Sequence, residues 1–266
     1  SPPAEIQKNE KHIGFLQEAM MQGAAGVAIA PMDPDMFDRR VAEVKNAGIP
    51  VVTFDADVAS QKNRVTFVGT DNFSAGEVLG QKGAEYLKEK GITSGSIALV
   101  STNMYQTTMI ARHDGIKSSF QRVMGPDAAN FKWLEPILDE DQSSVSKGQL
   151  EGQIVANPDM VLVFSLGSEG PDTGVMDALK SQGKASQIAH FGCDYTPTWE
   201  NGIAAGLIHG IVDQDAYSIG AGVVQALADA IDGKTLPSTI PVPVQWVLAG
   251  EIVAFGKAKQ EIPASQ

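Results

Sequence analysis

The sequence predicts an α/β protein whose parallel sheets are divided between two similar lobes. Short apolar runs alternate with amphipathic helical segments through most of the 266 residues, the order that repeated βαβ units produce. The run at 48–55 reads Gly-Ile-Pro-Val-Val-Thr-Phe-Asp, and its nearly continuous apolarity is typical of a parallel strand covered on both faces. The unit recurs too often for one small sheet, and the chain is long enough for two domains of ordinary size.

Hydrophobic periodicity and turn residues set the expected elements in chain order. Asp33-Pro34-Asp35 is expected to provide the turn and the N-cap of the second helix, and Gly48 to end it. Helices are expected at 4–22, 74–90, 109–124, 143–156, 198–204 and 216–232. Two further helices are expected, one from the turn at 33–35 to 47 and one from the loop at 167–171 to about 183. Strands are expected at 26–31, 48–55, 64–69, 96–101, 132–138, 159–165, 187–193, 207–212 and 241–247, with a short tail from 249.

The composition excludes several classes of protein. Hydrophobic residues make up 43% and charged residues 20% of the chain, as in globular proteins. The formal net charge of -12 argues against nucleic acid and anionic membrane as partners. No run of 18 apolar residues predicts a membrane span, and no basic-then-apolar leader opens the chain.

Familiar catalytic and cofactor motifs are absent. The sequence has no phosphate-binding P-loop, no dinucleotide-binding glycine motif after a strand, no H-E-x-x-H and no G-x-S-x-G elbow after a strand. The four histidines lack metal-ligand spacing, so we expect no metal site, no cofactor and no enzyme of a familiar kind. The lone Cys193 lies in an apolar strand pattern, which favours a small buried hydrophobe over a reactive thiol.

Polar side chains recur where the predicted strands end. Ligands of open parallel sheets bind beyond the carboxyl ends of the strands. Each residue alone also fits a cap or a turn, but carboxylates, amides and one Arg together suit a neutral ligand with many hydroxyls. Charge-assisted hydrogen bonds of this kind contribute roughly 1.5–3 kcal/mol each. The residues are Asp55, Thr70-Asp71-Asn72, Asn103, Asp194, Asp213-Gln214 and, at a helix start, Arg112.

Aromatic side chains could stack on the apolar face of a sugar. The candidates near predicted loops are Phe15, Tyr105, Tyr195 and Trp199. Ordinary core or surface packing is the alternative for each of them.

Four short motifs in order resemble one protein family. They are the 48–55 run, Val68-Gly-Thr-Asp-Asn72, Ala111-Arg-His-Asp-Gly115 and Phe191-Gly-Cys-Asp194. From about residue 4 to 247, the chain resembles the type I periplasmic sugar-binding proteins, in particular the ribose-binding branch. Related effector domains of lactose-repressor-type regulators share the pattern.

The resemblance implies an α/β fold of two Rossmann-like lobes with parallel sheets, joined by a three-segment hinge. The N-terminal lobe would comprise 1–71 and 215–243, and the C-terminal lobe 72–214 and 244–266. The ligand would lie between the lobes, which close on it by a hinge motion.

The same resemblance implies roles for individual residues. Asp55, Arg112, Asp194 and Gln214 would bind ligand hydroxyls, and Thr70 would make a weaker contact. The candidate ligand-binding set is Asp55, Thr70, Asn103, Arg112, Glu140, Ser168, Asp194 and Gln214.

Departures from the ribose-binding pattern argue for a different ligand. Ala56 and Gln142 each stand where ribose binders carry Arg, and 167–169 replaces the usual Asn. A Pro-Thr-Asp turn becomes Pro31-Met-Asp. A different sugar or a polyol is therefore expected.

The family begins with a strand, a helix and a second strand before the helix that opens here. We therefore interpret the chain as a fragment, or as one numbered after a lost segment. The first lobe would lack two strands and part of its ligand wall, and the full-length gene product is expected to be longer.

The implied function is an extracytoplasmic solute-binding protein that delivers a sugar or polyol to the permease of an ABC transporter. It would be a monomer, periplasmic, or lipid-anchored outside a Gram-positive cell. The alternative is the effector domain of a transcription regulator, against which the acidic charge and the lack of a helix-turn-helix pattern weigh. An enzyme on the same fold is a third possibility, without a visible nucleophile–base pair or metal set.

Overall fold

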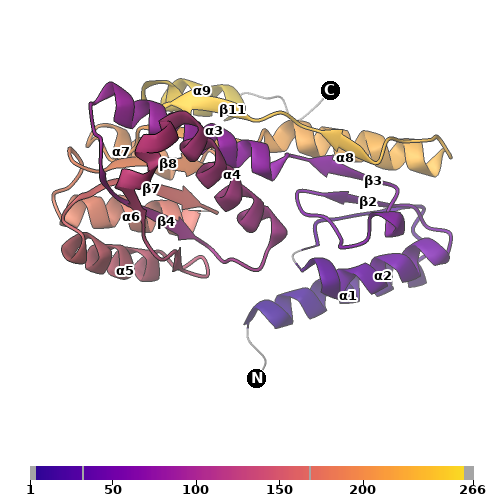
Figure 1. The fold of residues 1–266 in the computed structure, drawn as a ribbon. Helices are drawn as coiled ribbons and strands as arrows, with labels where there is room; N and C mark the ends of the chain where they lie inside the picture. Colours follow the sequence, from indigo (N-terminus) through magenta and orange to yellow (C-terminus); the bar gives the residue numbers. More distant parts are fainter. Residues whose placement is uncertain (1–3, 32, 168, 261–266) are drawn as a thin grey trace. The chain divides into compact units, whose positions relative to one another are not determined.

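A computed structural model describes residues 4–31, 33–167 and 169–260 (Figure 1). The chain divides into two compact units. Unit 1 comprises Ser1–Asp71, Tyr105–Thr107 and Asp215–Pro243, and unit 2 comprises Asn72–Met104, Thr108–Gln214 and Val244–Gln266. This division assigns Tyr105–Thr107 to unit 1, although the sequence analysis placed it in the second lobe.

Unit 1 is a parallel four-stranded sheet with helices on both faces. The strand order is β1-β2-β3-β10, and every neighbouring pair is parallel. Alternation along β2 sends Val51 into the core beneath α1 and α2, and Val52 into the core beneath α8. The strands are β1 (Val27–Ile29), β2 (Val51–Phe54), β3 (Thr66–Gly69) and β10 (Thr239–Pro241). The helices are α1 (Ala4–Met21), α2 (Pro34–Asn46) and α8 (Ala216–Ile231), with a 3-10 turn at Gln61–Asn63.

The predicted start of α2 is confirmed. Asp33 adopts an extended conformation and its Oδ1 accepts the backbone N–H groups of Asp35 and Met36 at 3.1 and 2.9 Å. Pro34 occupies the first helical position, where its missing N–H costs nothing. Among the described residues, β1 pairs with β2 alone. The expectation that the family's first strands precede residue 1 stays a prediction.

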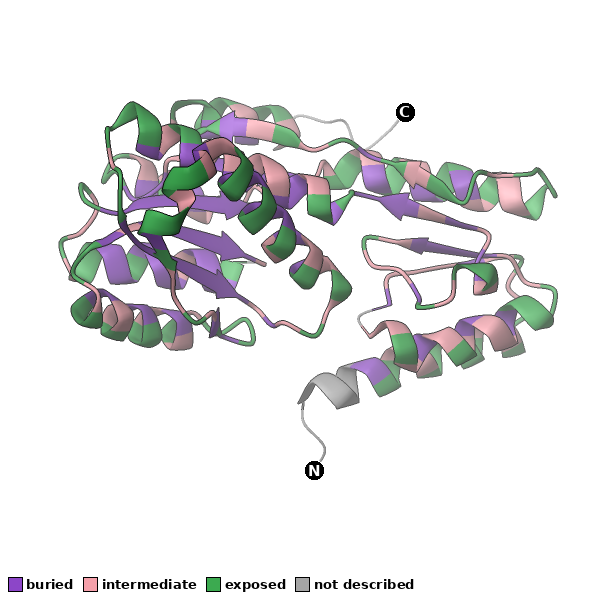
Figure 2. Cartoon of the chain, viewed as in Figure 1, coloured by how far each residue is buried: buried purple, intermediate pink, exposed green. Residues whose placement is uncertain are grey.

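Unit 2 contains a larger sheet in which all pairs but one are parallel. The order is β11-β9-β8-β7-β4-β5, with β6 also paired to β4 and only β11 antiparallel to its neighbour. Figure 2 shows its central strands buried, and every residue of β4 is buried. The strands are β4 (Gly95–Ser101), β5 (Phe131–Trp133), β6 (Ile137–Leu138), β7 (Met160–Leu166), β8 (Ala189–Cys193), β9 (Gly210–Asp213) and β11 (Gln245–Leu248).

Two apolar cores cover the faces of this sheet. One includes side chains of α3 and α4, and the other includes side chains of α5, α6, α7 and α9. The helices are α3 (Asn72–Glu89), α4 (Thr107–Met124), α5 (Ser143–Ala156), α6 (Glu169–Ser181), α7 (Thr198–Ile203) and α9 (Ile252–Gln260), with 3-10 turns at Gly125–Asn130 and Ala249–Glu251.

Two expected strands were wrong, and the short tail expected from 249 contains a helix. The strand at 132–138 is two pieces, because Pro136 lies between them and cannot donate to a ladder. The strand at 241–247 is also two pieces, broken by Pro243, and its halves belong to different sheets. The tail after 249 forms α9, whose Ile252 is fully buried in the second core.

Glycines bring α3 and α4 unusually close together. A Cβ at Gly76 would lie 2.1 Å from the Arg112 carbonyl oxygen, and one at Gly80 would lie 2.1 Å from that of Ile116. From the opposite helix, a Cβ at Gly115 would lie 2.1 Å from the Phe73 carbonyl oxygen. Because α4 begins at Thr107, these contacts lie within the helix and not at its start, and they fix the turn that carries Arg112.

Gly80→Ala should destabilise unit 2 by about 1–3 kcal/mol, because the added methyl overpacks a backbone contact that cannot yield. All three tryptophans lie in unit 2, so urea unfolding followed by tryptophan fluorescence reports on it. Gly152→Ala is the control, because no atom lies within 4 Å of a Cβ there and helix propensity favours Ala by up to about 1 kcal/mol. Equal stability of the two variants would contradict the close-contact interpretation.

Candidate functional site

The centre of the candidate site in unit 2 is the buried guanidinium of Arg112. The residue is only 3% exposed, and its Nε donates to Asn72 Oδ1 at 2.8 Å. Its Nη1 lies 3.9 Å from Asp194 Oδ2. A buried cation requires such partners because desolvation penalises an uncompensated charge.

Asp194 links Arg112 to Gln214. Its carboxylate accepts the Gln214 backbone N–H at 3.2 Å and the Gln214 Nε2–H at 2.8 Å. Burial raises the pKa of Asp194, while Arg112 and the Gln214 side chain act in the opposite direction. Gln214 Oε1 is a buried acceptor without a hydrogen-bond partner, so the group offers an acceptor beside a carboxylate and a guanidinium.

Asn103 and Glu140 lie on loops that follow neighbouring strands. Asn103 is 3% exposed, and its carbonyl accepts the Ser101 Oγ–H at 2.9 Å. Glu140 is exposed, and its N–H donates to the Thr102 carbonyl at 2.9 Å. Their strands β4 and β6 pair through Ser101 and Leu138, so both loops leave the same edge of the sheet.

Asp55 and Thr70 belong to unit 1. Asp55 is exposed, has a φ of 60°, and donates its N–H to the Val68 carbonyl at 3.2 Å. Thr70 is 4% exposed. Asp57, two residues after Asp55, instead forms an ion pair of 2.6 Å with the buried Arg64, which leaves Asp55 as the solvent-facing carboxylate of that loop.

The structure therefore brings Arg112, Asp194 and Gln214 together in unit 2. That Asp55 and Thr70 join them in one site stays a prediction of the sequence. Ser168 lies outside the described residues.

Of the aromatic candidates, Trp199 does not fit the expected role of stacking on a sugar, and that expectation was wrong. It is completely buried, and its indole N–H donates to the Asp194 carbonyl at 2.8 Å. Tyr195 is half-buried and hydrogen-bonded to Glu200. Phe15 and Tyr105 are 53% and 50% exposed.

A buried Asp172–Ser165–His190 chain lies in unit 2 and was missed by sequence reasoning. His190 Nδ1 is 3.0 Å from the Leu207 carbonyl, which can only accept, so Nδ1 carries the proton. Nε2 must then accept from Ser165 Oγ, 2.8 Å away. The 2.6 Å contact between Ser165 Oγ and Asp172 Oδ1 consequently needs a proton on Asp172.

The environment of this chain agrees with that protonation. Burial, followed by the nearby charges of Asp194, Asp139 and Asp141, raises the pKa of Asp172 well above its ordinary value. Burial also lowers the pKa of His190 to about 3. One sign of this hydrogen-bonded chain is visible in the sequence, an Asp in the first turn of α6. An Asp at that position is equally explained by its favourable interaction with the helix dipole.

The sequence has one cysteine, Cys193, and four histidines. Cys193 is buried as expected, and burial raises the pKa of its thiol to about 12. Across 4–31, 33–167 and 169–260, no group of three or more His, Cys, Asp or Glu could hold a metal ion. In the same residues, no helix is long and apolar enough to cross a membrane.

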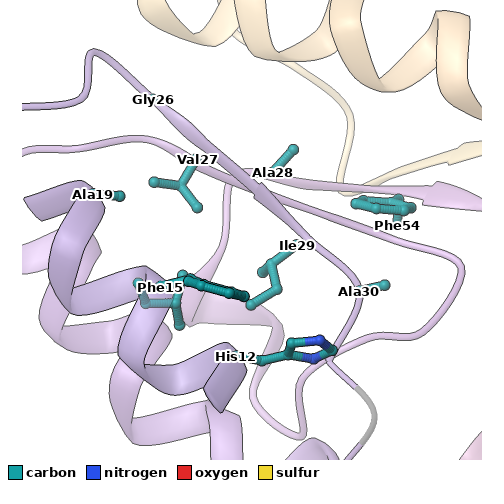
Figure 3. Close-up of a pocket in the computed structure, with 10 residues that line it drawn as sticks. His12, Phe15, Ala19, Gly26, Val27, Ala28, Ile29, Ala30 and Phe54 are labelled. Atoms are coloured by element: carbon teal, nitrogen blue, oxygen red, sulfur yellow. The ribbon is translucent and has the colours of Figure 1, made fainter. Parts of the chain in front are cut away.

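A separate pocket of about 500 Å³ lies in unit 1 (Figure 3). It lies between α1 and β1, and apart from His12 its side chains are apolar. Such a lining lacks the donors and acceptors that a polyhydroxylated ligand needs. The lining residues are His12, Phe15, Leu16, Ala19, Gly26, Val27, Ala28, Ile29, Ala30 and Phe54.

Comparison with known proteins places the fold in a family. A model of the periplasmic binding protein domain matches residues 2–235. The chain belongs to the periplasmic binding protein family. Its α/β units with parallel-rich sheets are those of the two-lobe type I fold of that family.

The names of several relatives include the sugar that they bind. The ribose import binding protein RbsB of Salmonella typhimurium is 25% identical over 238 residues, which cover 90% of this chain and 76% of the relative. The D-ribose/D-allose-binding protein of Pseudomonas aeruginosa is 26% identical over 251 residues, covering 89% and 74%. A carbohydrate transporter solute binding protein from Agrobacterium radiobacter, solved with D-arabinose, has a TM-score of 0.83 at 19% identity, covering 96% of this chain and 84% of that chain.

Asp172→Asn should remove part of the pH dependence of stability. The native state retains the Asp172 proton to a higher pH than the unfolded chain, whose Asp pKa is near 3.8. The contribution of Asp172 to stability is therefore fully present below that value and falls as pH rises toward the raised pKa, by up to about 1.4 kcal/mol per pH unit. The Asn amide donates to Ser165 without titrating, so the variant should be more stable at neutral pH, with the difference shrinking toward about pH 4.

Urea unfolding across this pH range measures the effect. Asp177→Asn is the matched control, because Asp177 is exposed on the same helix. A difference between Asp172→Asn and the natural protein that does not change with pH would contradict the buried proton.

Proposed function

We propose that this protein is an extracytoplasmic solute-binding protein that captures a sugar or polyol and delivers it to the permease of an ABC transporter. The observation that carries the proposal is the convergence of Arg112, Asp194 and Gln214 in unit 2. Each ligand hydroxyl could donate to the carboxylate or to Gln214 Oε1 while accepting from the guanidinium. Membership of a family whose named relatives bind sugars supports the same ligand class.

The chemistry of the group favours an uncharged ligand. The Arg112 guanidinium lies beside the Asp194 carboxylate, so their charges largely offset each other. A ligand with alternating donors and acceptors fits this group better than an anion or a cation does. Because Ala56 and Gln142 differ from the ribose-binding pattern, a sugar other than ribose or a polyol is the proposed ligand.

The relatives also bear on the alternatives. Family members are binding proteins that serve sugar transport, which supports capture and delivery over catalysis. The relatives named above are import or solute-binding proteins, which supports a transport role over that of a regulator's effector domain. Action as a monomer, partnership with a permease and a periplasmic location are parts of the same proposal.

A thermal-shift screen over D-ribose, D-arabinose, D-allose, D-fucose, xylitol and glycerol tests the ligand class. At least one should raise the melting temperature, because ligand at 100 times its Kd stabilises the native state by about 2.7 kcal/mol. Chromatography after incubation should recover that compound unchanged. Turnover of the compound would support the enzyme hypothesis instead.

Asp194→Ala should abolish this stabilisation, because ligand hydroxyls lose their half-buried acceptor and Arg112 loses its counter-charge. Asp127→Ala is the matched control, since Asp127 is an exposed acid of unit 2 and its loss should leave the thermal shift unchanged. An equal ligand-induced shift in both variants would remove Asp194 from the site.

A further inference from the structure

Asp194 has a backbone conformation that must be held in place. Its φ of 58° lies in the left-handed region that L-residues seldom adopt. Its N–H donates to the Val212 carbonyl at 2.7 Å, which continues the pairing of β8 with β9 by one residue. The peptide on the other side of Asp194 is therefore the one that decides where the side chain points.

The indole of Trp199 holds the carbonyl of that second peptide, and Asp213 Oδ2 accepts the N–H of the same peptide, from Tyr195, at 2.9 Å. Trp199 Nε1 donates to the Asp194 carbonyl oxygen at 2.8 Å. The Trp199 side chain is completely buried, within the core that α5, α6, α7 and α9 form over the sheet. A buried indole N–H needs an acceptor, and here the acceptor is the backbone of a candidate ligand-binding residue.

The strand beneath is adapted to receive this ring. A Cβ at Gly192 would lie 2.3 Å from Trp199 Cη2 and 2.9 Å from Ser165 Oγ. The His190 ring centroid lies 5.3 Å from that of Trp199. The ring is consequently wedged against β8 two residues before Asp194, and its N–H has little freedom to move.

We propose that Trp199 is a positioning residue that aims the Asp194 carboxylate at Arg112 and Gln214 through the bond from its indole N–H to the Asp194 carbonyl. The inference rests on the proposed function, in which Asp194 binds ligand hydroxyls. Without the indole bond, only the bond from the Tyr195 N–H to Asp213 Oδ2 holds this peptide, so Asp194 is freer to leave the left-handed region and turn its Cα–Cβ bond away from Gln214. Trp199 itself touches no ligand, because it is buried beneath the loop.

Trp199→Phe tests this role, because it keeps an aromatic ring and removes only the donor and part of the ring. Trp133→Phe is the matched control: Trp133 also lies in unit 2 but packs on Phe120 and Phe164. The first readout needs no ligand. Amide hydrogen exchange of Gln214, whose N–H donates to Asp194 Oδ1, should become about tenfold faster in Trp199→Phe, with the β4 and β7 amides unchanged.

The second readout is affinity for whichever of D-ribose, D-arabinose, D-allose or xylitol most stabilises the natural protein. Calorimetric titration should show a Kd about tenfold weaker in Trp199→Phe. In Trp133→Phe both the Kd and the Gln214 exchange rate should stay within about twofold of the natural protein. A merely structural role would instead speed exchange at all unit 2 amides together.

Unchanged Gln214 exchange in Trp199→Phe, or uniformly faster exchange throughout unit 2, would overturn the proposal. Selectively faster exchange at Gln214 with no sugar bound by the natural protein would overturn the proposed function and support the positioning role. If Trp199→Phe does not fold, the natural protein provides the measurement. Its Trp199 indole N–H and Gln214 amide should then exchange at one common opening rate, and unrelated rates would overturn the proposal.

Discussion

The candidate site of unit 2 is arranged around one buried cation, the guanidinium of Arg112, which lies between an amide and a carboxylate. Asn72 at the start of α3 and Asp194 after β8 provide those partners. The glycine contact between α3 and α4 makes this placement possible, because Gly76 lets the Arg112 backbone lie directly on α3. A substitution with no contact to a ligand could therefore displace the guanidinium.

Asp194 is supported from two directions by groups with different physical roles. Gln214 bonds its carboxylate, while Trp199 bonds its backbone from the core. Beneath the same strand, the Asp172–Ser165–His190 chain keeps a second carboxyl protonated inside the core. Only a neutral Asp172 can donate to Ser165, whereas the Asp194 carboxyl lies beside the Arg112 guanidinium, which lowers its pKa against the effect of burial.

Much of the fold was predictable because parallel strands covered on both faces read as continuous apolar runs. The helix at Ser143–Ala156 and the cap at Asp33 follow from local periodicity and local hydrogen bonding. Pro136 and Pro243 can be seen in the sequence, but their effect on the two strands could not be predicted from it. Whether a missing N–H interrupts a strand depends on which neighbouring strand would accept that hydrogen bond. The halves around Pro243 pair with β3 and β9, strands of different sheets.

Sequence by itself determined the alternation of strands and helices, the family pattern and the polar residues at the strand ends, since these depend on neighbours in the chain. Tertiary structure alone decided which polar residues meet and which aromatic ring is buried. Arg112, Asp194 and Gln214 are separated by many residues, and only the stacking of βα units brings them together. Trp199 was read as a possible ligand platform, and the absence of a side chain at Gly192 placed it in the core instead.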